Sequence, residues 1–122
     1  MSISICFTIH IQMQKEYLGE FEELILTMVA ILGEESYGNA IVNEIDQQVD
    51  RKVNLSAVHV TLYRLEDKGH VKSHMGGATT SRGGRKKRLF QITNAGLELL
   101  HAIKEQRALL WKFVPQLKAV RV

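Results

Sequence analysis

The apolar positions of residues 18–32, LGEFEELILTMVAIL, recur every three to four residues. That spacing is typical of an amphipathic helix that buries one side against a core. Three glutamates fall in its first turns, where negative charge suits the positive end of a helix dipole, and Gly33 is a suitable end. The sequence therefore predicts a first helix whose core-facing side consists of Phe21, Leu24, Ile25, Met28, Val29 and Leu32.

Residues 36–49, SYGNAIVNEIDQQV, predict a second and shorter helix. Ser36 is its candidate N-cap, because a serine hydroxyl can accept from the free N–H groups of a first turn. The residues DRKV that follow form a polar link. We expect the inner side of this helix to consist of Ala40, Ile41, Ile45 and Val49.

Residues 54–69, NLSAVHVTLYRLEDKG, predict a third helix that Asn54 or Ser56 can cap and that Gly69 ends. Its apolar residues follow the i, i+4, i+7 spacing of a core-facing stripe. They are Val58, Leu62 and Leu65.

The N-terminal half of the opposite face of this third helix carries no acidic residue. It offers hydroxyl, imidazole, methyl and guanidinium groups, which suit contact with DNA, although an ordinary exposed helix face is the alternative. Arg64 can instead pair with a nearby acid. At 100° per residue this face holds Ser56, Val60, Tyr63, Arg64 and Asp67, with Ala57 and His59 on its flanks. The residues expected to contact DNA are Asn54, Ser56, Ala57, His59, Val60, Tyr63 and Arg64.

Two short alternating stretches, HVKSHM and RLFQIT, predict a β-hairpin with a loop of about ten residues. The loop is rich in glycine and in cations. Glycine lets a backbone approach a phosphate closely, so we expect the loop to contact DNA; a solvated loop is the alternative. The residues concerned are Arg82, Gly83, Gly84, Arg85, Lys86, Lys87 and Arg88.

Residues 94–114, NAGLELLHAIKEQRALLWKFV, predict a final helix that Thr93 caps and that Pro115 ends near Phe113. One series of positions steps by 3, 4, 3, 4 and 3, which is the seam of a coiled coil with one polar insertion. Such a seam requires a partner helix, so we expect dimerisation through Leu100, Ile103, Arg107, Leu110, Val114 and Leu117.

Residues 1–13, MSISICFTIHIQM, alternate strictly between apolar and polar side chains, which is a strand pattern. We expect this strand to pair across a dimer or onto the domain. The alternative is an upstream extension, since Met13 can also begin a protein. The predicted organisation is an N-terminal extension over residues 1–14, a domain over 15–93 and a dimerisation helix over 94–122.

The chain of 122 residues suffices for one domain with a modest core. A single cysteine, Cys6, excludes an intrachain disulfide and favours an intracellular protein. No apolar run is long enough to span a bilayer, and the first residues lack the pattern of a signal peptide. We therefore expect a cytoplasmic protein without membrane association.

The net charge of +3 is distributed unevenly along the chain. Residues 1–50 carry a net charge of −8, residues 51–93 carry +8 and residues 94–122 carry +3. A basic middle third indicates a polyanionic partner, although a solvated basic face would have the same composition.

Catalytic and metal-binding patterns are missing from the sequence. His70 and His74 belong to the predicted hairpin rather than to one helical face, and His101 stands alone. Without cysteine or carboxylate neighbours at ligand spacing, we expect no metal and no cofactor. No nucleophile has a local base or orienting partner, so we expect no enzymatic activity.

Three helices, a two-stranded hairpin and a fourth helix are the element order of a winged helix-turn-helix domain, a mainly α fold with a small β-hairpin (α+β). In that fold the third helix enters the major groove of double-stranded DNA, and the hairpin, or wing, contacts the neighbouring backbone. The basic loop would supply affinity by releasing counterions but would carry no sequence information.

Five segments in the same order resemble the PadR family of bacterial transcriptional regulators: LGEFEELIL, SYGNAI, VNLSAVHVTLYRLEDKGHV, RGGRKKRLFQIT and TNAGLELL. The resemblance covers roughly residues 17–112. Three positions depart from the family pattern, which has tyrosine at His59, tyrosine at Phe90 and often proline at Asn94. The single last helix is similar to that of short-tailed members.

This resemblance implies a homodimeric, nucleoid-associated repressor that binds a near-palindromic operator and leaves it on a small-molecule or stress signal. It also implies a groove for a flat aromatic effector at Leu110, Trp111 and Phe113, for which dimer packing is the alternative. Tyr37 is expected to donate to a phosphate or to pack between helices. The other function class left open is a winged-helix module that binds protein or RNA.

Overall fold

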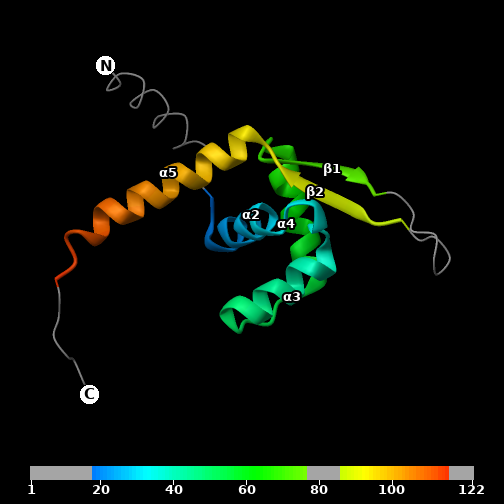
Figure 1. The fold of residues 1–122 in the computed structure, drawn as a ribbon, viewed down its shortest axis with the longest axis horizontal. Coiled ribbons are helices and arrows are strands. Elements are labelled where there is room, and N and C mark those ends of the chain that lie inside the picture. Colours follow the sequence, from blue (N-terminus) through cyan, green and yellow to red (C-terminus); the bar gives the residue numbers. More distant parts are fainter. Residues whose placement is uncertain (1–17, 77–85, 116–122) are drawn as a thin grey trace.

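The computed structural model describes residues 18–76 and 86–115. Within them the fold is mainly α with one small antiparallel hairpin, which confirms the predicted fold class (Figure 1). The predicted N-terminal strand and most of the basic loop lie outside the described residues. The elements in chain order are α2 (Glu20–Leu32), the 3-10 helix η1 (Gly33–Glu35), α3 (Gly38–Val49), α4 (Leu55–Asp67), β1 (Val71–Met75), β2 (Arg88–Ile92) and α5 (Asn94–Trp111).

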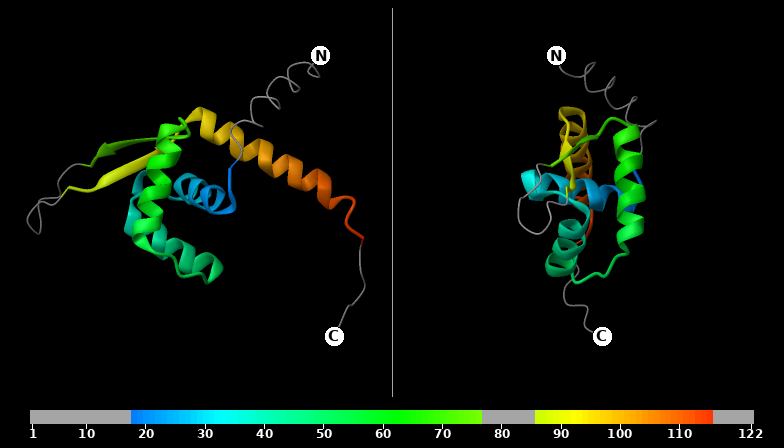
Figure 2. Two further views of the ribbon diagram at one scale, coloured as in Figure 1. Left: turned by 180° about the vertical axis from the view of Figure 1, so that it is seen from behind. Right: turned by 90° about the vertical axis from the view of Figure 1, so that its right-hand side faces the viewer.

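Helices α2, α3 and α4 form a body from which the hairpin and α5 extend in opposite directions (Figures 1 and 2). The strands β1 and β2 pair antiparallel, with Val71 opposite Ile92 and Met75 opposite Arg88. The hairpin therefore projects from the body, with the Met75–Arg88 pair at its far end.

In the core, the apolar sides of α2, α3 and α4 pack against the base of the hairpin. As predicted, the stripe of α4 is fully buried, and Ile41 and Ile45 of α3 are buried with it. Leu26 is also fully buried although it lies outside the predicted stripe of α2, because the short α2 is covered on two sides by α3 and α4. The buried apolar residues are Leu18, Ile25, Leu26, Met28, Val29, Ile41, Ile45, Val58, Leu62, Leu65, Val71, Phe90 and Leu99.

The start and the end of α3 correct the sequence prediction. Ser36 does not cap the helix: Tyr37 occupies the N-cap position, and Ser36 is fully buried. The turn η1 moves the N-cap one residue later, and the carbonyl oxygen of Ser36 accepts a hydrogen bond of 2.8 Å from the N–H of Phe90. Val49 was expected on the inner side but is 53% exposed, since it is the last residue of α3.

The join between the hairpin and α5 depends on a close contact of two backbones. Thr93 caps α5 by accepting from the N–H of Gly96, as predicted, and its hydroxyl donates to the carbonyl oxygen of Gly69. A Cβ at Gly96 would collide with the carbonyl oxygen of His70. Glycine at this position therefore lets the first turn of α5 cross the chain that enters β1.

The acidic start of α2 binds three separate parts of the chain through ion pairs. The most buried carboxylate is that of Glu22: burial raises its pKa, but the N–H of Gly19 and the ammonium of Lys68 together hold the pKa below its ordinary value. The three pairs are Glu20 with Arg51 at 2.7 Å, Glu22 with Lys68 at 3.1 Å and Glu23 with Arg107 at 2.7 Å.

Helix α5 ends at Trp111, close to the predicted end before Pro115. Its first half packs on the body through Leu99, Leu100 and Ile103. In the described part of the chain, no helix is both long and apolar enough to cross a membrane.

Candidate nucleic-acid interface

Helix α4 begins at a fixed residue because Asn54 caps it. The Asn54 Oδ1 accepts hydrogen bonds from the N–H groups of Ser56 at 2.7 Å and Ala57 at 3.3 Å. Of the two predicted caps, Asn54 is the one that the structure uses, and Ser56 is exposed. The side chain of Asn54 is thus already engaged within the protein.

The face of α4 opposite its buried stripe is exposed, as its spacing predicts. Val60 is 55% exposed and Tyr63 is 46% exposed, and the first turn contains no acidic residue. Arg64 is exposed and forms no ion pair among the described residues. The nearby acid Glu66 accepts a hydrogen bond from the Ser73 hydroxyl instead. Contact of this face with DNA stays a prediction.

His59 lies at the junction of α4 and α3. A Cβ built on Gly38, the first residue of α3, would lie only 2.5 Å from the His59 Nε2. On its other side the imidazole contacts the Tyr63 ring, with 6.4 Å between centroids. Gly38 therefore allows the imidazole to lie against the first turn of α3.

Aromatic contacts connect this junction to the wing. The Tyr63 ring meets the buried Phe90 ring of β2 edge-on, with 5.9 Å between centroids. The Lys87 Nζ lies 4.0 Å from the centroid of the Tyr37 ring, a favourable cation–π contact. Tyr37, half-buried, thus packs against the start of the wing and not only between helices; its predicted phosphate contact is untested.

The described part of the wing carries exposed cations at the start of β2. Lys86, Lys87 and Arg88 are all exposed. The Arg88 Nη1 donates to the Ser73 Oγ at 2.9 Å, and that hydroxyl donates to the Glu66 Oε2 at 2.8 Å. This relay links β2 through β1 to the end of α4. The other predicted wing residues, Arg82, Gly83, Gly84 and Arg85, lie outside the described residues.

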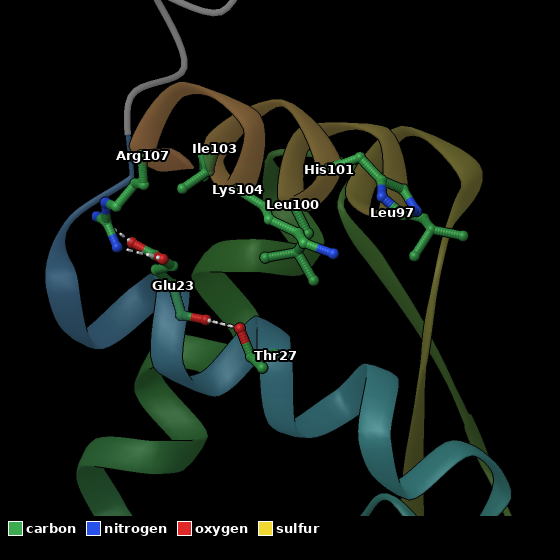
Figure 3. A pocket seen from close by; sticks show the side chains of 8 residues that line it. All are labelled: Glu23, Thr27, Leu97, Leu100, His101, Ile103, Lys104 and Arg107. Atoms are coloured by element: carbon green, nitrogen blue, oxygen red, sulfur yellow. Dashed lines mark hydrogen bonds and ion pairs between the residues drawn. The ribbon is translucent and has the colours of Figure 1, made fainter. Parts of the chain in front are cut away.

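A groove of about 450 Å³ lies between α2 and the first half of α5 (Figure 3). The sequence predicted an effector groove elsewhere, at Leu110, Trp111 and Phe113, which lie in the exposed second half of the helix and just beyond it. Sequence spacing gave no signal for this groove, since it depends on how α5 crosses α2. It is lined by Glu23, Thr27, Leu97, Leu100, His101, Ile103, Lys104 and Arg107.

The predicted dimerisation seam divides into two parts in the single chain. Leu100 and Ile103 pack partly on the core, and Arg107 forms its ion pair with Glu23. Leu110 is 60% exposed and Val114 is 46% exposed. Leu117 lies outside the described residues, and the role of the seam in dimerisation stays a prediction.

The helices and the hairpin together define a winged helix-turn-helix domain, with α3 and α4 as the helix-turn-helix and β1–β2 as the wing. A model of the transcriptional regulator PadR-like family matches residues 25–102. The chain belongs to this family, which confirms the resemblance found in its sequence.

Solved structures share this fold. A PadR family transcription regulator from hypervirulent Clostridium difficile has a TM-score of 0.65 and 20% identity, over 77% of this chain and 93% of that chain. A PadR-like regulator from Bacillus cereus has a TM-score of 0.62 and 22% identity, over 83% and 90%. Bacillus subtilis PadR, solved with operator DNA, has a TM-score of 0.57 and 19% identity, over 84% and 52%. The comparison with curated proteins found no match.

The cap of α4 can be tested apart from any contact with DNA. We expect Asn54→Ala to lower the free energy of unfolding by about 1 kcal/mol, because two N–H groups of the first turn lose their acceptor. Asn54→Ser keeps an acceptor and should retain most of the stability; Ser56→Ala, at an exposed position, is the matched control. Urea unfolding measures the three differences. Equal stability of Asn54→Ala and the wild type would contradict the capping role.

Proposed function

We propose that the protein is a sequence-specific, double-stranded DNA-binding transcriptional regulator, acting as a homodimeric repressor on the bacterial nucleoid. The observation that carries the proposal is the exposed face of α4, free of acid in its first turn, beside the exposed cations that begin β2. Membership of a family of transcriptional regulators supports it. The structural likeness to Bacillus subtilis PadR, a protein solved with operator DNA, is consistent with it.

The two parts of the interface have different roles in this proposal. The outer face of α4 reads base edges in the major groove, through Ser56, Val60 and Tyr63. The cations of the wing bind backbone phosphates and release counterions, which adds affinity for every sequence. Specificity then depends on α4, and the salt dependence depends on the wing.

Dimerisation along the second half of α5 accounts for its exposed apolar side chains. Leu109, Leu110, Trp111, Phe113 and Val114 are all at least 46% exposed in the single chain. Exposed apolar surface on one helix favours association with a second copy. A twofold dimer would read two half-sites of a near-palindromic operator, about one helical turn apart.

A small aromatic effector or a stress signal would release the repressor from DNA. Trp111 and Phe113 offer ring surfaces for stacking between two protomers. The second candidate function, a winged-helix module for protein or RNA, has the same basic wing. The acid-free first turn of α4 favours DNA, because a major-groove face has to meet base edges and phosphates.

Selection of bound duplexes from a random pool tests the proposed function most directly. We expect an enriched sequence with two related half-sites about ten base pairs apart. A pool without enrichment, together with tighter binding to single-stranded RNA than to duplex DNA, would favour the interaction module instead.

The wing is expected to supply affinity that is independent of sequence. Replacing two cations, Arg85→Ala with Lys87→Ala, should weaken binding to selected and random duplexes alike. The slope of log affinity against log salt should fall by about two to four units for the dimer, since up to two phosphate contacts are lost at each of its two half-sites. Lys104→Ala with Lys112→Ala on α5 removes the same charge away from the interface and should leave the slope unchanged. An unchanged slope in the wing variant would refute this role.

Tyr63 is expected to contribute to sequence preference. Tyr63→Phe keeps the ring that packs on Phe90 and removes only the hydroxyl. The ratio of affinities for selected and random duplexes should fall. If the hydroxyl bonds a base edge, the difference in binding free energy between the two duplexes should shrink by about 1–3 kcal/mol. Competition binding at one salt concentration measures that ratio. Equal losses on both duplexes would assign the hydroxyl to a phosphate.

The exposed end of α5 is expected to hold the dimer together. Leu110→Glu with Val114→Glu should convert a dimer into a monomer, because two carboxylates would be buried without partners. Both side chains are exposed in the single chain, so its own core and thermal midpoint should be preserved. Sedimentation equilibrium measures the mass, with Gln106→Glu as a one-charge control on the same helix. A variant that stays dimeric would place the interface elsewhere.

A further inference from the structure

His59 lies where α3 and α4, the two helices of the helix-turn-helix, meet. Its Nε2 lies against Gly38 at the start of α3, and its ring contacts Tyr63 of α4. Tyr37, which precedes Gly38, holds the Lys87 ammonium over its ring. The imidazole thus belongs to the boundary between α3 and α4, away from the middle of the outer face of α4.

That boundary faces the DNA backbone when a helix-turn-helix docks. The second helix lies in the major groove while the first crosses the backbone, so a side chain between the two lies near a phosphate. His59 is half-buried and forms no hydrogen bond or ion pair with any described carboxylate. Its ring nitrogens are therefore available to a phosphate oxygen.

The groups that face His59 are neutral or cationic. Its own helix contributes the Tyr63 ring, and α3 contributes Gly38 in a first turn without acidic residues. Tyr37, which precedes Gly38 in the chain, contacts Lys87 of the wing. Among the described residues no carboxylate bonds to the imidazole, so a DNA phosphate would be its first anionic hydrogen-bond partner.

Resting on the proposed function, we propose that His59 is a proton-linked contact to DNA. In the complex its imidazole takes up a proton from solvent, and the resulting imidazolium donates a hydrogen bond to a backbone phosphate. Imidazole is the side chain that changes charge between about pH 5 and 8, and a charge-assisted hydrogen bond is stronger than a neutral one.

The sign of the effect follows from linkage. A phosphate stabilises the charged imidazole only in the bound state, so binding DNA takes up protons and a lower pH favours binding. The duplex affinity of the protein should rise as the pH falls through neutrality. Since the partner is a phosphate, the same rise should occur on selected and on random duplexes.

The test measures duplex affinity by fluorescence anisotropy with the full-length protein, at fixed salt, from about pH 6 to about pH 8. We expect the affinity of the wild type to be about fivefold higher or more at the acidic end. His59→Phe fills the space above Gly38 without titrating and should lose most of this difference. His101→Gln, in the α2–α5 groove, is the matched control and should retain it.

Three results would overturn the proposal. The first is an undiminished pH dependence in a folded His59→Phe or His59→Gln variant, with folding checked by the thermal midpoint. The second is a pH dependence on the selected duplex alone, which would assign His59 to a base edge. The third is a His59 ring-proton titration in nuclear magnetic resonance spectra whose midpoint does not rise on adding random duplex. Absence of duplex binding at every pH would instead refute the proposed function, and the proton linkage with it.

Discussion

The buried stripe of α4 determines the surface that the protein presents to a partner. Val58, Leu62 and Leu65 are fully buried against α2 and α3. Because side chains three and four apart share one side of a helix, burying this stripe fixes the rotation of α4 about its own axis. The opposite residues, Val60 and Tyr63, are then exposed. The outer face of α4 is thus settled by the same hydrophobic contacts that stabilise the fold.

The wing is oriented by the same helix. Phe90, nearly fully buried, donates its N–H to Ser36 and receives the edge of the Tyr63 ring. At the far end of α4, Glu66 accepts from Ser73, which accepts from Arg88. Two contacts therefore join β2 to the body, one through Phe90 and one through Arg88. A cation at the start of β2 has a defined position relative to the outer face of α4, which a flexible basic tail would not provide.

Sequence spacing predicted those parts of the structure that depend on neighbours along the chain. The stripe of α4, the cap at Thr93 and the end of α5 before Pro115 all follow from local rules, and the structure confirms them. The misplaced cap at Ser36 has a tertiary cause: the turn η1 directs this residue into the core, where its carbonyl oxygen meets β2. The groove between α2 and α5 likewise depends on the crossing of two helices far apart in sequence. The contact of His59 with Gly38 has the same origin, since no periodicity connects the two residues.

The division of charge along the sequence has a structural explanation that also concerns function. The acidic first part of the chain binds cations from elsewhere: Glu20, Glu22 and Glu23 pair with Arg51, Lys68 and Arg107, and Asp46 pairs with Lys52. All four carboxylates lie on α2 or α3, outside the first turn of α3. The cations at the start of β2 form no ion pair with a described carboxylate. Lys87 contacts a tyrosine ring, and Arg88 donates to a serine hydroxyl. The carboxylates of α2 and α3 are thus neutralised, whereas the cations at the start of the wing are not, and this concentrates positive potential beside α4. Such a local excess attracts a polyanion more effectively than a net charge of +3 spread over the surface.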